Sequence, residues 1–166
     1  MGMFSILFPS IRLIENSIEF FIDNIIRDKI NSPAIGSIVY CELNFGVAEH
    51  SGVYIGNDSI IHLDGSGAVE VVSSEKFLKR LGGFNTALSI YVSCRNGIPV
   101  GSQKIAQRAA WRLGTSRDYN VILNNCHQFT AGCLSGNFEN SCSFLMFLKS
   151  EAKTIINADE WRVWDR

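Results

Sequence analysis

Apolar residues near the start of the chain recur at helical spacing. Between residues 11 and 30 they fall on one stripe, while most charged side chains lie outside it, which predicts an amphipathic helix. Such a helix docks onto the core of its own domain, onto a second copy of the chain, or onto a membrane surface. The polar face is not rich in lysine, which disfavours the membrane alternative. The stripe consists of Ile11, Ile14, Ile18, Phe21, Ile22, Ile25 and Ile30.

After Pro33 the spacing changes to short β-rich runs separated by turn residues. The runs predict an antiparallel meander of five strands, at residues 37–41, 50–55, 59–63, 68–72 and 88–92. Helices are predicted from Ser102, as N-cap, through Leu113 with a stop at Gly114, from Cys126 to about Ser135, and over residues 144–156. No structure is predicted for the tail, residues 159–166. The expected fold class is α+β, with the meander packed against helices.

Length and composition favour one compact domain with appendages. A chain of 166 residues with 46% hydrophobic residues builds one real core and divides poorly into two. We expect an amino-terminal helical extension at 1–32, one compact domain at 33–136 and a carboxyl-terminal extension at 137–166. A net charge of −1 gives no general basic surface, so composition offers no support for nucleic-acid binding.

The five cysteines are odd in number and contain no Cys-x-x-Cys pair. Together with the absence of a recognisable export signal, this disfavours a disulfide framework and a structural zinc site. We therefore expect a reducing, cytoplasmic location, neither a signal peptide nor a spanning helix, and no metal or other cofactor. Zinc held by histidines and Cys126 is the less favoured alternative.

Cys126 follows two asparagines at a predicted helix start. Asn125 is a good N-cap, which makes Cys126 the first helical residue. Unpaired backbone N–H groups and partial positive charge at a helix amino terminus favour thiolate over thiol. The pattern is typical of a nucleophilic cysteine, although buried cysteines are more often inert.

A thiol nucleophile needs a proton acceptor, and histidine suits that task near neutral pH. His50 and His62 lie on predicted strands joined by a turn at residues 56–58. A plain two-residue turn puts them on opposite faces, whereas a three-residue loop or a bulge pairs Gly52 with His62 and puts both on one face. We expect the second arrangement, with the Cys126 helix packed on that same face. His127 is a weaker partner, because successive helical positions point about 100° apart.

Four segments in this order resemble the lecithin retinol acyltransferase family, which includes the H-Ras-like suppressor phospholipases and acyltransferases and belongs to the permuted side of the NlpC/P60 superfamily. They are residues 33–39, 50–56, 60–63 and 119–129. The resemblance implies a circularly permuted papain-like fold with the nucleophile at a helix amino terminus. It also implies a Cys-His-His triad in which Cys126 is the nucleophile, His50 the general base and acid, and His62 the orienting residue.

The resemblance implies chemistry through an acyl-cysteine, with a phospholipid or lipid-like ester or amide as the acyl donor. Two features depart from the family pattern. His127 and Gln128 follow the cysteine where Glu-His is usual, and Ser51 replaces the aromatic residue that commonly follows the first histidine. These departures concern the substrate pocket more than the three catalytic positions.

Two other functions stay open. The first is an NlpC/P60-like cysteine peptidase or amidase, which keeps the thiol mechanism. The second is a catalytically silent interaction module that binds a partner, or forms a homo-oligomer, through the apolar helix at 11–30. For the enzyme hypotheses we expect an acyl substrate and peripheral membrane contact, and no nucleic-acid partner.

Overall fold

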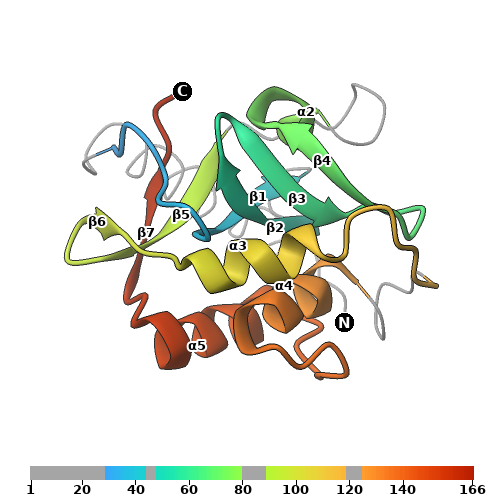
Figure 1. Cartoon of the computed structure of the whole chain (residues 1–166). Coiled ribbons are helices and arrows are strands. Elements are labelled where there is room, and N and C mark those ends of the chain that lie inside the picture. Colours follow the sequence, from blue (N-terminus) through green and yellow to red (C-terminus); the bar gives the residue numbers. More distant parts are fainter. Residues whose placement is uncertain (1–28, 44–47, 80–88, 119–124) are drawn as a thin grey trace, which may run out of the picture.

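The structure is a computed structural model, and it describes residues 29–43, 48–79, 89–118 and 125–166. In this part of the chain an antiparallel sheet carries helices on both faces (Figure 1). The helix predicted at 11–30 lies outside the described residues, apart from its last two positions. Ile30 pairs with the tail of the chain, because its backbone N–H donates to the carbonyl of Val163 at 3.1 Å. The α+β class is confirmed.

Four strands form the predicted meander: β1 (Ile38–Leu43), β2 (Ala48–Gly56), β3 (Ser59–Leu63) and β4 (Val69–Ser73). The fifth, β5 (Ile90–Arg95), pairs with β1 and not with β4, so the prediction of a five-stranded meander is wrong. The sheet order is β4-β3-β2-β1-β5-β6. Burial explains the order, since β5 is buried at five consecutive positions and needs neighbours on both sides, whereas exposed side chains in β4 suit an edge.

Three short elements had no counterpart in the sequence prediction: α2 (Ser74–Leu78), β6 (Ile98–Pro99) and β7 (Glu160–Val163). Strand β7 pairs antiparallel with β5 over residues 91–94, so part of the tail without a predicted structure completes the sheet. A four-residue strand of this kind depends on a partner far away in sequence.

The longer helices begin where predicted. Helix α3 (Gln103–Ala110) has Ser102 as N-cap, but it ends before Leu113 in a turn that reaches Gly114. Helix α4 (Cys126–Ser135) has both predicted bounds and is followed by Gly136 with a left-handed φ of 91°. Helix α5 (Leu145–Ile156) follows an extended Phe144.

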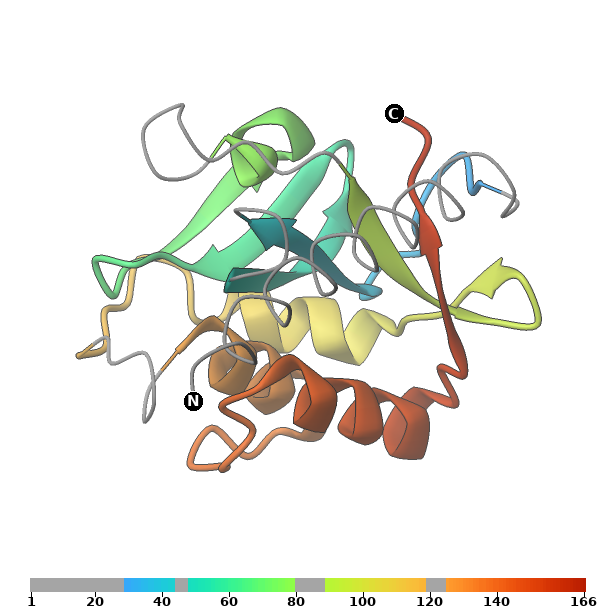
Figure 2. The same cartoon turned by 180° about the vertical axis from the view of Figure 1, so that it is seen from behind.

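The sheet separates two apolar layers. Helices α3, α4 and α5 lie along one face and α2 lies on the other, as the view from behind also shows (Figure 2). The first layer combines Val53 and Ile61 of the sheet with Phe129 of α4, and the second combines Ile60 with Phe77 of α2. Alternate residues of each strand therefore enter different cores.

Candidate active site

The β2–β3 hairpin determines where the two predicted histidines lie. Asn57 and Asp58 both have left-handed φ angles, 48° and 55°, as expected for the two-residue turn that suits a hairpin. A register shift between Tyr54 and Gly56 adds a bulge, and beyond it Val53 pairs with Ile61. Continuing that register puts Gly52 opposite His62, so the bulged alternative of the sequence analysis is the one observed.

His50 and His62 lie on one face and are hydrogen-bonded. The His50 Nε2 and His62 Nδ1 atoms are 3.1 Å apart, and the two rings meet edge to face. Both side chains are buried, and the ring of Phe77 packs against each of them. Gly52 leaves room for this pair, because a Cβ there would lie 3.2 Å from the His62 Cβ.

Glu70 on β4 extends the histidine pair and was missed in the sequence analysis. Its Oε1 atom lies 3.3 Å from His62 Nε2, and the two residues are directly opposite in the β3–β4 register. The sequence analysis predicted no register between these two strands, and the role of Glu70 becomes visible only when they are paired. A carboxylate beside Nε2 favours the proton on that nitrogen, which leaves His62 Nδ1 as an acceptor.

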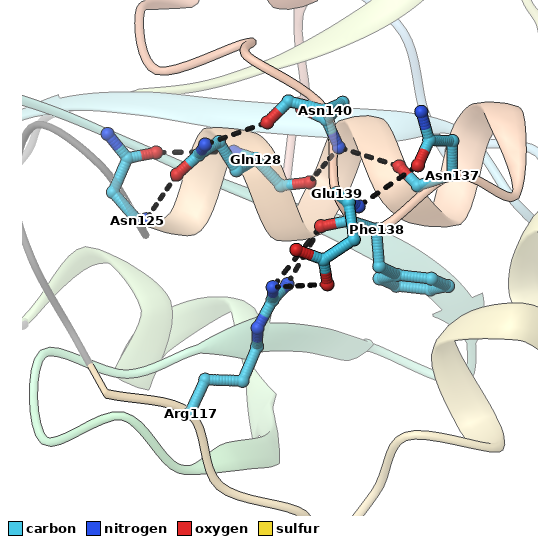
Figure 3. A network of polar contacts seen from close by, with 7 residues as sticks. All are labelled: Arg117, Asn125, Gln128, Asn137, Phe138, Glu139 and Asn140. Atoms are coloured by element: carbon cyan, nitrogen blue, oxygen red, sulfur yellow. Dashed lines mark hydrogen bonds and ion pairs between the residues drawn. The ribbon is translucent and has the colours of Figure 1, made fainter.

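The start of α4 is fixed by side-chain capping. The Asn125 Oδ1 atom accepts hydrogen bonds from the backbone N–H groups of His127 and Gln128, at 3.0 and 3.2 Å. The Gln128 Oε1 atom in turn accepts a hydrogen bond from the backbone N–H of Asn125, which completes a capping box, and the Gln128 Nε2 group donates to the Asn140 carbonyl (Figure 3). Gln128, one of the two departures after the cysteine, thus stabilises the helix start.

Cys126 occupies the first turn of α4 and is 3% exposed. Its Sγ atom lies 4.0 Å from the backbone carbonyl oxygen of Glu49, the residue before His50. The helix amino terminus favours a thiolate at this position. Elsewhere, burial raises the pKa of Cys133 to about 12 and that of Cys94 to about 11, so those thiols stay protonated.

Helix α4 packs on the face opposite to the one predicted. Phe129 enters the layer below the sheet, whereas His50 and His62 face Phe77 above it. The prediction that the helix covers the histidine face is therefore wrong. The Cys126 sulfur contacts β2 at the backbone carbonyl of Glu49, the residue next to His50 in sequence.

His127 and Ser51 meet on the helix-covered face of β2. The Ser51 Oγ atom is 2.8 Å from His127 Nδ1 and 3.1 Å from the hydroxyl of Thr130, which donates to the Cys126 carbonyl at 2.8 Å. Burial lowers the pKa of His127 to about 4, which keeps it neutral at pH 7. Burial raises the pKa of Glu49, whose Oε2 lies 3.9 Å from His127 Nε2, while nearby Lys149 acts against that rise.

Neither a metal cluster nor a spanning helix is found in the described part of the chain. Among these residues no three His, Cys, Asp or Glu side chains are grouped so that they would hold a metal ion. No helix within the described ranges combines the length and the apolar character needed to cross a bilayer. None of the five cysteines, all of which lie in the described ranges, forms a disulfide.

Similarity to known proteins extends over most of the chain. A stretch of 129 residues, 76% of this chain, is 27% identical to part of the genome polyprotein of avian encephalomyelitis virus (strain Van Reokel), of which it spans 6%. The family model of lecithin retinol acyltransferase matches residues 31–139, which include both histidines, Cys126 and the strands and helices that carry them. The chain belongs to the lecithin retinol acyltransferase family.

Proposed function

We propose that the protein is a thiol-dependent acyl hydrolase or acyltransferase that works through an acyl-cysteine intermediate on a phospholipid or lipid-like ester or amide. Cys126 is the nucleophile, His50 the general base and acid, and His62 the residue that orients His50. The observation that carries this proposal is the 3.1 Å hydrogen bond between the two buried histidines, beside a capped helix that begins at a cysteine. The family's permuted papain-like architecture is part of the same proposal.

Proton placement explains why His50 is the base. With a proton on His62 Nε2, next to Glu70, the His62 Nδ1 atom accepts a hydrogen bond. His50 Nε2 must then donate, so the lone pair of His50 lies on Nδ1. That nitrogen takes the proton from the Cys126 thiol, and the bond to His62 stabilises the imidazolium that forms.

The reaction follows from these roles. The Cys126 sulfur attacks the carbonyl carbon of the ester, and the backbone N–H of Cys126 stabilises the oxyanion. When the intermediate collapses, the carbon–oxygen bond breaks and His50 gives its proton to the departing alcohol. Water, an alcohol or an amine then loses a proton to His50, attacks the thioester and releases the free thiol.

Exposed apolar side chains near the site support a lipid substrate. Phe144, Met146 and Phe147, at the start of α5, are 57%, 69% and 46% exposed. They are close to the start of α4, because the Asn125 amide donates to the carbonyl of Ser143 at 2.7 Å. A cluster of exposed apolar groups beside a reactive thiol is suited to an acyl chain or a lipid surface. Membrane contact and oligomer formation through residues 11–30 stay predictions.

Trapping the intermediate tests the proposal. The full chain is incubated with phosphatidylcholine vesicles, quenched in acid and digested, and the Cys126 peptide is weighed by mass spectrometry. We expect an acyl adduct on Cys126 that hydroxylamine removes, none in Cys126→Ala, and the same adduct in the matched control Cys133→Ala. Fatty acid release that persists in Cys126→Ala would refute the thiol mechanism, and cleavage of muropeptides without phospholipid cleavage would favour the peptidase alternative.

A further inference from the structure

Besides the contact between Cys126 and Glu49, strand β2 and helix α4 are joined by the residues that follow His50 and Cys126 in sequence. Ser51 follows His50 on β2, and His127 follows Cys126 on α4. Successive strand residues point to opposite faces, so Ser51 faces the helix while His50 faces Phe77. Ser51, Thr130 and His127 are 0%, 0% and 5% exposed, which shields their hydrogen bonds from water.

The donor and acceptor in each of these hydrogen bonds can be assigned, because Thr130 and Ser51 each have only one hydroxyl proton to donate. The backbone carbonyl of Cys126 can only accept, so Thr130 uses its one hydroxyl proton there, at 2.8 Å. Thr130 Oγ1 must then accept from Ser51 at 3.1 Å, which uses the one proton of Ser51. The remaining contact, 2.8 Å from Ser51 Oγ to His127 Nδ1, requires that the imidazole donates.

Neutral His127 therefore carries its proton on Nδ1. Burial, which lowers the pKa of His127 to about 4, leaves a single ring proton at neutral pH. The competing influence is Glu49, whose carboxylate would draw that proton to Nε2. The Glu49 Oε2 atom is 3.9 Å from Nε2, beyond hydrogen-bond range, whereas Ser51 is at 2.8 Å from Nδ1.

We propose that His127, Ser51 and Thr130 are positioning residues whose directional hydrogen bonds hold the first turn of α4 against β2 and thereby place Cys126 relative to His50. The two ends of the connection are the side chain of His127 and the carbonyl of Cys126, so it fixes both the backbone and the rotation of the first helical turn. This proposal rests on the proposed function, because it concerns the thiol that the reaction uses.

The test measures the pH dependence of Cys126 alkylation by iodoacetamide in the full chain, together with thermal unfolding of each variant. Thr130→Val removes the hydroxyl and keeps the shape. Thr154→Val is its matched control, since Thr154 also donates to a carbonyl four residues earlier, at 3.0 Å, but lies on the exposed side of α5. His127→Asn keeps an N–H group near the position of Nδ1, and His127→Gln moves it toward Nε2.

We expect wild type, Thr154→Val and His127→Asn to share one pH profile. In Thr130→Val, Ser51→Ala and His127→Gln, alkylation at pH 7 should slow by roughly tenfold, because a misplaced thiol loses contact with its base, and the profile should move toward that of free cysteine, near pH 8.5. Equal profiles in all folded variants would overturn the proposal while leaving acyl-cysteine formation intact.

A second measurement does not depend on whether any variant folds. The nitrogen-15 shifts of the wild-type His127 ring report which nitrogen carries the proton, and we expect Nδ1. A proton on Nε2 would overturn the directional connection even if Cys126 forms an acyl adduct. A wild-type Cys126 that iodoacetamide does not alkylate would overturn this proposal, whereas loss of acyl adducts with normal alkylation would overturn the proposed function alone.

Discussion

Replacing Gly52 by alanine tests the histidine arrangement with one methyl group. A Cβ at Gly52 would lie 2.8 Å from the Ile61 carbonyl oxygen, 2.8 Å from a methyl group of Ile60 and 3.2 Å from the His62 Cβ. Ordinary contact begins near 3.4 Å, so the β3 backbone would have to retreat by about 0.6 Å. Overpacking of this kind costs about 1–3 kcal/mol.

The retreat of the β3 backbone would also disturb His50, the proposed base. If His62 retreats with its strand, its 3.1 Å bond to His50 lengthens past the normal hydrogen-bond range. We therefore expect Gly52→Ala to lose about 1–3 kcal/mol in urea unfolding and to show slower alkylation of Cys126 at pH 7.

Gly65→Ala is the matched control. Nothing lies within 4 Å of a Cβ at Gly65, so this variant should unfold within about 0.5 kcal/mol of wild type. Gly52→Ala with unchanged stability and unchanged alkylation would refute the reasoning, because it would mean that β2 and β3 do not approach as closely as this register requires.

Three other predictions concern the buried His127, the buried thiol of Cys133 and the carboxyl-terminal end of α4. The pKa of His127 is about 4 in the folded chain and near 6.5 when unfolded, so the unfolded state binds more protons between these values and stability falls as pH drops from 6.5 to 4. Urea unfolding at pH 7 and 4.5 should show a loss of up to about 3 kcal/mol that is smaller in His127→Asn; equal losses would assign the acid sensitivity to other groups. Because burial raises the pKa of Cys133 to about 12, peptide mapping at pH 7.5 should find iodoacetamide on Cys126 long before Cys133, and comparable labelling would contradict the burial of Cys133. Arg108 donates to the carbonyls of Cys133 and Leu134 at 3.1 and 2.7 Å, so Arg108→Met should lower the free energy of unfolding by about 1–2 kcal/mol, and exposed Lys104→Met by much less; the reverse order would rule out this cap.

The sequence predicts local elements well where their signals are local. Asn125 and Gln128 act on backbone groups within one turn, so the start of α4 could be located from the pattern Asn-Cys-x-Gln. The hairpin at Asn57-Asp58 was also recognised, but its turn residues allow two registers, and the expected one was chosen because the catalytic hypothesis requires it. The choice depended on a bulge near Ile55, which the turn residues alone do not specify.

The pattern could not predict which face α4 covers. Every residue from Cys126 to Leu134 is buried, so the helix has no polar side that would orient it. The partner of β5 was predicted wrongly and β7 was not predicted at all, for a related reason. The pairing of both strands is decided by partners more than 45 residues away in sequence. Glu70 was missed because its role appears only after β3 and β4 are paired.

The wrong prediction for α4 changes how the site is understood. If the helix covered the histidine face, Cys126 would meet His50 across a packed core and ordinary apolar contacts would fix their distance. In the observed arrangement the helix lies on the other face, and the sulfur is 4.0 Å from the Glu49 carbonyl. Because β2 is pleated, two successive residues point to opposite faces. His50 is hydrogen-bonded to His62 on one face, and Ser51 is hydrogen-bonded to His127 of α4 on the other. Apolar contacts of Phe129 hold α4 against the sheet, and under our proposal the polar contacts at the helix start then place the thiol within that packing.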